Sequence, residues 1–266
     1  MSIQRNANTR AFGVELGHPT YRLRQARYYE LATDITRLAK EKEARGLGPL
    51  SVLDVGTFDG VTRMYVEAQA ADQPIEWHGV DIFPHGHEFV YKHADWNLYN
   101  CDLEVGLTSL PSNRFDVVVC EQVLEHLHAA EHASQELTRV LRPGGTLFAG
   151  VPIFPPGVHL ARKHLVPMTD RLLGVKKVRG HVQAFSLASF RRLMKSSGPM
   201  EIRRARGFRI ISGGFLRPLE FHRWWWQLNR TIGRIVPSLC IETQIVAVKT
   251  AATPSKENVA PLSKAA

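Results

Sequence analysis

Acidic side chains and histidines follow one hydrophobic segment of the sequence. Residues 115–120, Phe-Asp-Val-Val-Val-Cys, are apolar apart from one aspartate and predict a buried strand. Gln122, Glu125 and His126 then stand at positions i, i+3 and i+4, so they would share one face if a helix begins there. His181 comes just before another predicted helix. Carboxylate and imidazole groups in this arrangement are suited to general acid–base catalysis.

A glycine-hinged turn after another hydrophobic strand is the second chemical signal. Residues 52–60 read Val-Leu-Asp-Val-Gly-Thr-Phe-Asp-Gly, and Gly56 and Gly60 would let the backbone bend sharply and approach a ligand. The turn leads into a helix predicted at 61–70, whose free amide groups favour ligand oxygens. Asp54 would direct a carboxylate towards the same place. This stretch predicts a nucleotide-type cradle.

Three further strands extend the pattern. Asp81 ends a predicted second strand, where an acid would hydrogen-bond a ribose diol. A third strand would end at 100–103, Asn-Cys-Asp-Leu, which offers the carboxylate of Asp102 and the apolar side chain of Leu103. Another strand is predicted at 146–151, after an Arg-Pro-Gly-Gly turn. Alternating strands and helices predict an α/β fold with a parallel sheet.

These motifs, in this order and spacing, resemble those of class I S-adenosylmethionine-dependent methyltransferases, and of the ubiquinone-type O-methyltransferases among them. The resemblance rests on V-L-D-V-G-x-x-x-G, G-V-D-I, C-D-L-E, F-D-V-V-V-C-E-Q-V-L-E-H-L and L-R-P-G-G-T-L-F. It covers residues 50–152 closely and 180–250 loosely. It implies a doubly wound, Rossmann-like α/β sheet of seven strands, with the last strand antiparallel and helices on both faces. It also implies S-adenosyl-L-methionine as the cofactor.

The resemblance gives seven residues a place around this cofactor. They are Asp54, Gly56, Gly60, Asp81, Asp102, Leu103 and Glu121. Asp54, Gly56 and Gly60 would lie along the methionine part of the cofactor. Asp81 would hold the ribose hydroxyls, and Asp102 with Leu103 would frame the adenine. Glu121 would contact the cofactor as well. Phe58 replaces the glycine that the family usually has between the two retained ones, which crowds the cradle.

The resembled O-methyltransferases, and the small-RNA 2′-O-methyltransferases, bind a divalent cation through Glu-x-x-Glu-His and a later histidine. Here the first position is Gln122, and a glutamate, Glu121, comes one residue earlier, so the candidate ligand set is incomplete. That set is Gln122, Glu125, His126 and His181. We therefore favour catalysis without a metal, with His126 or His181 as the base and Glu125 beside them. A purely structural role for either histidine is a second interpretation.

Charge is distributed unevenly along the 266 residues. Residues 1–150 contain 14 Lys and Arg and 20 Asp and Glu residues, for a net charge of −6, whereas residues 151–266 contain 20 and 5, for +15. This asymmetry points to an anionic partner for the second half: nucleic acid, an anionic membrane surface or a phosphorylated substrate. A merely solvated basic face is the alternative.

We divide the sequence into three parts. Residues 1–48 would form an irregular lead-in and a helix at 21–45, which either serves as a lid on the cofactor crevice or only covers the sheet. Residues 49–250 would form the S-adenosylmethionine-dependent methyltransferase domain. Residues 251–266, mostly small and polar, are expected to be a disordered tail.

Two basic insertions, at about 152–179 and 207–239, would leave the sheet at its carboxyl end and overhang the catalytic mouth. The second contains Trp224, Trp225 and Trp226 among several arginines, and at least one of these tryptophans should be exposed. Trp and Arg suit an anionic membrane surface. Packing as a satellite core and stacking on nucleic acid are the other interpretations.

These observations predict O-methylation of a small, amphiphilic or lipid-linked acceptor, such as a quinone precursor, a glycolipid or a sugar intermediate. An RNA 2′-O-methyltransferase and a non-catalytic methyltransferase-fold partner subunit are the alternatives. The polar beginning of the sequence and the absence of an apolar run of roughly 18–20 residues favour a cytoplasmic protein, with peripheral attachment to the inner face of the membrane left open.

Overall fold

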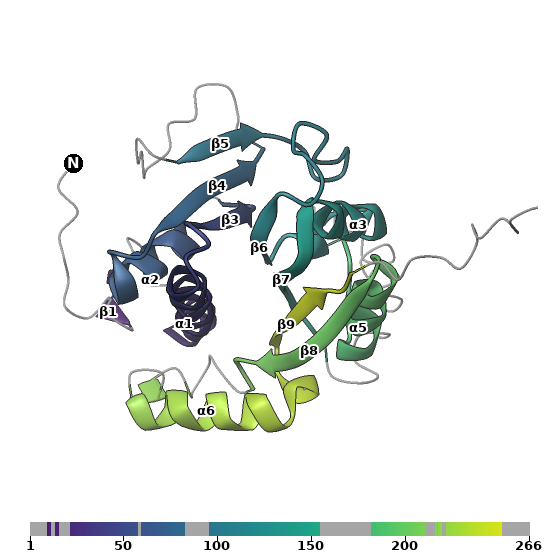
Figure 1. Cartoon of the computed structure of the whole chain (residues 1–266). Coiled ribbons are helices and arrows are strands. Elements are labelled where there is room, and N and C mark those ends of the chain that lie inside the picture. Colours follow the sequence, from purple (N-terminus) through teal and green to yellow (C-terminus); the bar gives the residue numbers. More distant parts are fainter. Residues whose placement is uncertain are drawn as a thin grey trace, which may run out of the picture.

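The computed structural model describes residues 10–11, 14–15, 22–57, 60–82, 96–154, 182–210, 216, 218–219 and 222–251. Within this part of the chain, seven strands form one sheet in the order β5-β4-β3-β6-β7-β9-β8 (Figure 1). The strands are β3 (Leu50–Val55), β4 (Ile75–Asp81), β5 (Asn97–Asn100), β6 (Phe115–Glu121), β7 (Leu141–Pro152), β8 (Met200–Gly207) and β9 (Glu242–Lys249). The helices are α1 (Arg22–Ala44), α2 (Val61–Ala70), α3 (Ala130–Val140), α5 (Leu187–Ser196) and α6 (Arg223–Ile235).

The direction of the strands confirms the predicted α/β sheet. β5, β4, β3, β6 and β7 are parallel neighbours, whereas β9 runs antiparallel to both β7 and β8. A short antiparallel pair, β1 (Arg10–Ala11) with β2 (Val14–Glu15), lies in the lead-in that was expected to be irregular. The chain therefore crosses repeatedly between the faces of one sheet, and the carboxyl ends of the parallel strands gather at one edge.

Helices cover both faces of the sheet and bury two hydrophobic clusters. α1 and α2 lie on one face, where Leu31 and Ile35 pack with Val117 and Val119 of β6; α3 and α5 lie on the other (Figure 1). On that second face, Val118 of β6 packs among the other cluster. Neighbouring β6 residues thus face opposite helix layers, as the uninterrupted apolar run of this strand predicts.

Local signals in the sequence explain where the helices begin. Gly60, at φ 69°, starts α2, which matches the predicted helix. Ser186 caps α5, because its hydroxyl accepts a hydrogen bond from the amide of Ser189 and the Ser189 hydroxyl accepts one from the amide of Ser186. α3 begins at Ala130, earlier than the expected Ser134.

The second insertion contains α6 and the short 3₁₀ helix η4 (Pro237–Leu239), which connect β8 to β9. α6 lies below α1 and beside β8 in Figure 1. A Cβ atom added at Gly233 would lie 1.9 Å from the carbonyl oxygen of Gly207, so this glycine lets α6 cross the end of β8 closely. Trp224 is exposed, as expected for at least one of the three tryptophans, whereas Trp225 and Trp226 are half-buried.

Several expectations fall on residues outside the described ranges. These are the crowding by Phe58, nearly all of the first insertion, and the tail beyond residue 251. Among the described helices, none is both long and apolar enough to span a bilayer.

Candidate functional site

The carboxyl ends of β5, β4, β3 and β6 bring the predicted acids to one edge of the sheet. Val55 pairs with Val80 of β4 and with Cys120 of β6, and Asp81 pairs with Asn100 of β5. Because these strands are parallel and in register, the acids at or just beyond their ends lie along the same edge. They are Asp54, Asp81, Asp102 and Glu121.

Both glycines of the turn after β3 have a packing reason within the protein. A Cβ atom at Gly56 (φ 76°) would lie 2.3 Å from Cγ2 of Val123, and one at Gly60 would lie 2.7 Å from the ring of Trp96. The amide of Gly56 donates to the carbonyl of Val80 at 2.8 Å, which ties the turn to β4. We expected a ligand to approach the backbone closely at these two glycines. At the positions that a Cβ atom would occupy, the close neighbours are instead the side chains of Val123 and Trp96.

Asp54 is a buried carboxyl at the end of β3, with 3% of its surface exposed. Burial raises its pKa to about 7, while a hydrogen bond from Thr62 lowers it and the charges of Glu121 and Asp81 raise it further. A carboxyl of this kind is neutral in slightly acidic solution. It would become charged most easily when a cation binds beside it.

The next two acids are more accessible. Asp81 is half-buried, and its Oδ1 accepts the amide of Ile82 at 2.8 Å. Asp102 is also half-buried and accepts the amide of Glu104 at 2.8 Å, which closes the turn after β5. Leu103, by contrast, is 4% exposed and packs in a hydrophobic cluster, so it presents little surface to a ligand.

Glu121 belongs to a buried ion cluster that the sequence did not reveal. Its Oε2 lies 3.0 Å from Nε of Arg27 in α1, without the alignment of a hydrogen bond, and its Oε1 accepts the amide group of Gln244 in β9. Nη1 of Arg27 also donates to Glu242 at 3.1 Å. Gly150 of β7 leaves room for this carboxylate, since a Cβ atom there would lie 2.2 Å from Oε2 of Glu121.

Gln122, Glu125 and His126 do not share a helical face. Gln122 has φ 59°, outside the helical region, and the short 3₁₀ helix η2 spans Leu124–His126. The expected arrangement at i, i+3 and i+4 is therefore wrong, because the backbone turns at the first of the three residues. His126 is 45% exposed and Glu125 is 1% exposed, with His126 Nε2 and Glu125 Oε1 3.8 Å apart.

Glu125 is the most unusual acid at this edge. Neither of its carboxylate oxygens has a hydrogen-bond partner among the described residues at ordinary geometry. Burial raises its pKa to about 7; its own backbone amide and the charge of Arg27 oppose the shift, and Glu121 adds to it. Its backbone carbonyl accepts the amides of Val182 and Gln183 at 2.8 and 2.9 Å, which fixes the chain after β6.

His181 lies outside the described residues, so the structure does not place it. Among the residues that the structure does describe, no group of three His, Cys, Asp or Glu side chains could hold a metal ion. Cys120 is buried in β6, and burial raises the pKa of its thiol well above the usual value. Asp54 and Glu125 are the two acids at this edge whose carboxyl pKa burial raises to about 7.

A family model described as "Methyltransferase domain" matches residues 23–198, which is more than half of the chain. The chain belongs to this methyltransferase family. No curated protein matches it. The match extends from α1 through α5 and includes the acids at the carboxyl edge of the sheet, which we call the acidic edge: Asp54, Asp81, Asp102, Glu121 and Glu125. Glu242 and Gln244 of β9, which contact Arg27 and Glu121, lie beyond the match.

Solved structures of three other proteins, two of them described as methyltransferases, have the same fold. One from Galdieria sulphuraria, provisionally assigned as a sarcosine dimethylglycine methyltransferase, has a TM-score of 0.54 at 14% identity, over 86% of each chain. A provisionally assigned Haloferax volcanii methyltransferase, solved with the Trm112 methyltransferase activator, has a TM-score of 0.50 at 17% identity, over 84% of this chain and 98% of that one. The YcgJ protein of Bacillus subtilis has a TM-score of 0.50 at 15% identity, over 84% and 99%.

The family is that of class I S-adenosylmethionine-dependent methyltransferases, and the edge of the sheet fits their cofactor. When bound, S-adenosylmethionine supplies a methyl group on a positively charged sulfur. The N-terminus of α2 at Gly60 has no side-chain cap, so its amides can meet a carboxylate. The half-buried Asp81 and Asp102 offer acceptors for hydroxyl and amino groups, and Asp54 offers a carboxyl that a cation would favour in its charged form.

Proposed function

We propose that this methyltransferase methylates a hydroxyl oxygen of a small, amphiphilic or lipid-linked acceptor, of the kind of a quinone precursor, a glycolipid or a sugar intermediate. The observation that carries the proposal is the Glu125 carboxyl, buried beyond β6 without a described hydrogen-bond partner and with a pKa of about 7. A hydroxyl acceptor must lose a proton as its oxygen attacks the methyl group. A carboxylate with a pKa near neutrality is suited to take that proton.

The surroundings of Glu125 support this assignment. Burial excludes the water that would otherwise solvate the carboxylate, which makes it more basic than an exposed one. Nε2 of His126 is 3.8 Å from Oε1 of Glu125, and the His126 side chain is 45% exposed, so we propose that it passes the proton to solvent. His181 stays a second candidate base, because it precedes Val182, whose amide donates to the carbonyl of Glu125.

We further propose how the chain's residues hold the cofactor. Asp81 would accept the ribose hydroxyls, Asp102 would accept the adenine amino group, and Asp54 with the turn from Gly56 to Gly60 would lie along the methionine part. Glu121 and Leu103 have other roles in this proposal. Glu121 holds Arg27 of α1 against the sheet, and Leu103 contributes to the core.

The amphiphilic character of the acceptor is proposed from the second insertion. α6 connects the carboxyl end of β8 to the start of β9 and carries exposed apolar side chains, including Trp224 and Ile235. An apolar surface beside the edge where methyl transfer occurs would suit an acceptor with a lipid part. It would also suit an enzyme that is cytoplasmic and attaches peripherally to the inner face of the membrane, which is the localisation we propose.

The proposal is tested by transfer of labelled methyl groups to a panel of prenylated dihydroxyphenols and polyprenyl-linked sugars. Glu125→Gln should lower kcat by at least about 100-fold, because an amide cannot accept the proton. It should leave S-adenosylhomocysteine affinity unchanged. The control Glu131→Gln, at an exposed acid of α3, should be fully active. An active Glu125→Gln variant would remove the proposed base, and methylation of amines or carboxylates alone would remove the proposed acceptor class.

A further inference from the structure

Three basic residues of α5 differ from the described arginines of β8 in their ion pairing. Arg191, Arg192 and Lys195 form no ion pair with a described residue, whereas Arg204 and Arg206 of β8 pair with Asp34. The three cations line a cavity of about 600 Å³ with Ser186, Leu187 and Ala188 of α5 and Ser238 of η4. Uncompensated positive charge around a hollow of this size attracts an anion.

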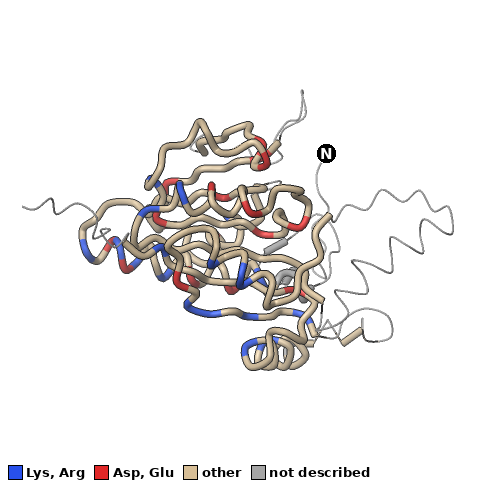
Figure 2. Tube along the Cα trace, turned by 90° about the vertical axis from the view of Figure 1, so that its right-hand side faces the viewer, with Lys and Arg blue, Asp and Glu red and all other residues tan. Residues whose placement is uncertain are grey.

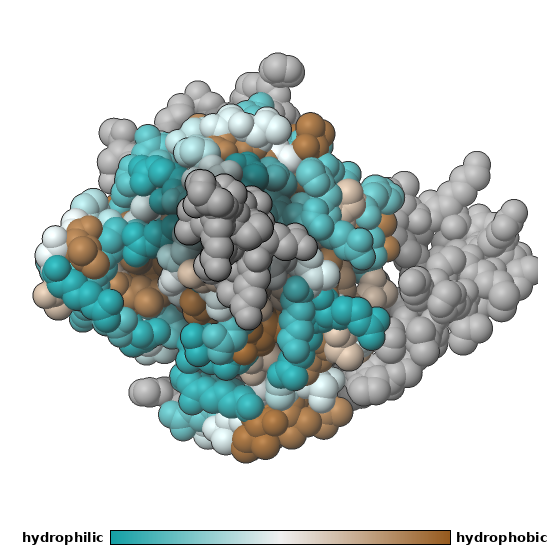
Figure 3. Space-filling model, turned by 45° about the vertical axis from the view of Figure 1, so that its right-hand side comes forward, coloured by the Kyte–Doolittle hydropathy of each residue, from teal (hydrophilic) through white to brown (hydrophobic). Residues whose placement is uncertain are grey.

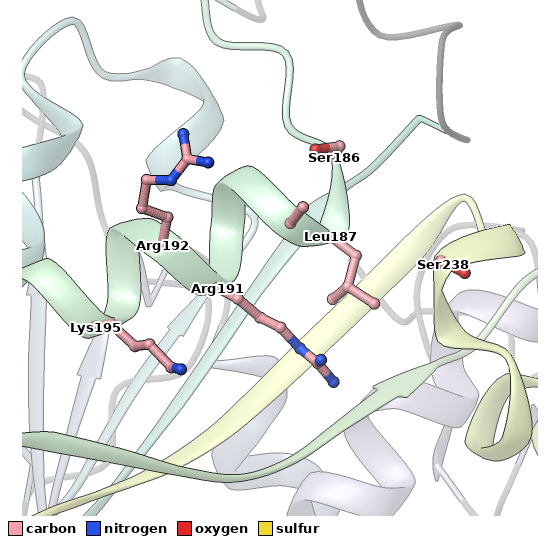
Figure 4. Close-up of a pocket in the computed structure, with 7 residues that line it drawn as sticks. Ser186, Leu187, Arg191, Arg192, Lys195 and Ser238 are labelled. Atoms are coloured by element: carbon pink, nitrogen blue, oxygen red, sulfur yellow. The ribbon is translucent and has the colours of Figure 1, made fainter.

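The positions of these side chains define the cavity further. Figure 4 shows Arg191, Lys195 and Leu187 extending from the lower side of α5, while Arg192 extends from the upper side. Arg191 and Lys195 are four residues apart and therefore neighbours on one helix face. An apolar side chain, Leu187, completes the same row. The cavity thus combines three cations with an apolar wall, and two of these cations, Arg191 and Lys195, extend from the same side of α5 as Leu187.

Exposed apolar side chains continue from this cavity along η4 and α6. Leu239, next to Ser238 of the cavity, is 49% exposed, and Ile235, Leu228 and Trp224 are 73%, 42% and 54% exposed. We call these four residues the apolar stripe. In Figure 3, a hydrophobic patch lies at the lower edge of the molecule, where Figure 1 shows α6, and hydrophilic residues lie above it.

The other side of α6 is held by ion pairs. Arg230 and Arg234 both pair with Glu30 of α1, the latter at 3.1 Å. This fixes the rotation of α6, so that the apolar stripe faces away from α1. The stripe is therefore a fixed surface of the fold, with Arg230 and Arg234 beside it on α6 and the α5 cavity at its Leu239 end.

The charge around the stripe identifies its partner. Among the described residues, Arg191, Arg192 and Lys195 lie at the α5 cavity, and Figure 2 shows basic positions along the lower part of the chain, where β8 and α6 lie. A soluble phosphate would satisfy the cations of α5 but leave the apolar stripe in water. An RNA backbone would do the same. A surface that offers both phosphate and hydrocarbon is an anionic phospholipid bilayer.

We propose that the α5 cavity and the apolar stripe form one docking surface for an anionic membrane. A lipid headgroup phosphate lies between Arg191 and Lys195, and the stripe enters the boundary between headgroups and acyl chains. α6 joins strands at the carboxyl edge of the sheet, so docking turns the acidic edge towards the bilayer. This deepens the proposed function, on which it rests for the nature of the acceptor, but docking itself requires neither cofactor nor methyl transfer.

The test is vesicle co-flotation of the full chain, without cofactor, at physiological salt. Vesicles of phosphatidylcholine are compared with vesicles that also contain phosphatidylglycerol. Arg191→Ser with Lys195→Ser should lower the partition coefficient by about 30-fold, since each cation near an anionic surface contributes roughly five-fold. Ile235→Ser with Leu239→Ser should lower it by at least about ten-fold.

A matched control removes two charges elsewhere. Lys40→Ser with Arg45→Ser changes exposed residues near the C-terminal end of α1, at the opposite edge of the sheet, and should leave flotation within about two-fold of the unaltered protein. Thermal unfolding of each variant shows whether it is folded. Glu125→Gln should float like the unaltered protein, so loss of turnover and loss of docking are separate outcomes.

Three results would overturn the proposal. One is flotation that ignores both the α5 and the stripe substitutions. Another is a protein that does not float with any vesicle composition but binds a phosphate reporter at the α5 cavity. If inorganic phosphate displaces that reporter, the ligand is a soluble phosphate. The third is single-stranded RNA binding that depends on Arg191 and Lys195 in a protein that does not float.

Discussion

Arg27→Met should destabilise the fold far more than loss of an ordinary arginine. The side chains of Arg27, Glu121 and Glu242 are only 5%, 3% and 2% exposed, and Arg27 lies 3.0 Å and 3.1 Å from the two acids. Removal of one partner from a buried ion pair leaves an uncompensated charge and costs about 3–5 kcal/mol. For a chain of this size, that corresponds to a fall in Tm of roughly 6–20 °C.

The loss of stability in Arg27→Met should depend on pH, because it depends on whether the Glu121 carboxyl is charged. Burial raises the pKa of its carboxyl, and the charge of Arg27 opposes that shift. In Arg27→Met the pKa of Glu121 should rise further. A carboxyl whose folded pKa exceeds its unfolded pKa lowers stability as the pH rises through the folded value. The deficit of the variant should therefore grow as the pH rises above the unfolded pKa of the glutamate, about 4.5.

Urea unfolding followed by circular dichroism measures both effects. Arg37→Met is the matched control on the same helix, because Arg37 is 55% exposed and pairs with the exposed Glu41. This change should cost less than about 1 kcal/mol at every pH. Adding Glu121→Gln to Arg27→Met should restore part of the stability, since one of the two buried carboxylates that Arg27 neutralised is then uncharged. Equal losses for Arg27→Met and Arg37→Met would refute the buried cluster.

Two further changes test the acidic edge and the insertion. Burial raises the pKa of Asp54 to about 7, above its unfolded value of about 4, so the stability that the protonated carboxyl contributes is lost as the pH rises from about 4 through 7. Asp54→Asn should therefore gain roughly 3 kcal/mol over the unaltered protein between pH 5 and pH 8, because part of the loss already occurs below pH 5. Parallel pH profiles in urea unfolding would contradict this. Gly233→Ala should cost about 1–3 kcal/mol, because its Cβ atom would lie 1.9 Å from the backbone oxygen of Gly207. Thr231→Ala, at an exposed position of α6, should change Tm by less than about 2 °C, and equal Tm values for these two variants would deny the close crossing.

Local patterns predicted the framework of this fold well. The helix from Val61 to Ala70, the cap at Ser186 and the buried strand beginning at Phe115 all follow from signals within a few residues. Hydrophobic periodicity and capping act over one or two turns, so they can be read directly from the chain. The seven strands and the antiparallel direction of the last one followed from the resemblance to a family with known topology.

The candidate site was less predictable, because its contacts join distant parts of the chain. Arg27 meets Glu121 and Glu242 only after the sheet has formed, and no local pattern marks that pairing. The positive φ of Gln122 breaks the expected helical face at one residue, where glycine or asparagine would have been the usual signal. The sequence shows only that Arg27 stands four residues before Leu31, on the face of the helix that is apolar at Leu31 and Ile35.

Binding of S-adenosylhomocysteine, measured by isothermal titration calorimetry, tests the central claim most directly. The unaltered protein should bind one equivalent saturably. Asp81→Ala should bind at least about ten-fold more weakly, because a ribose hydroxyl loses its charged acceptor, and Glu125→Gln should bind like the unaltered protein. Absence of saturable binding, or binding that ignores Asp81, would contradict a cofactor site at the carboxyl edge of the sheet.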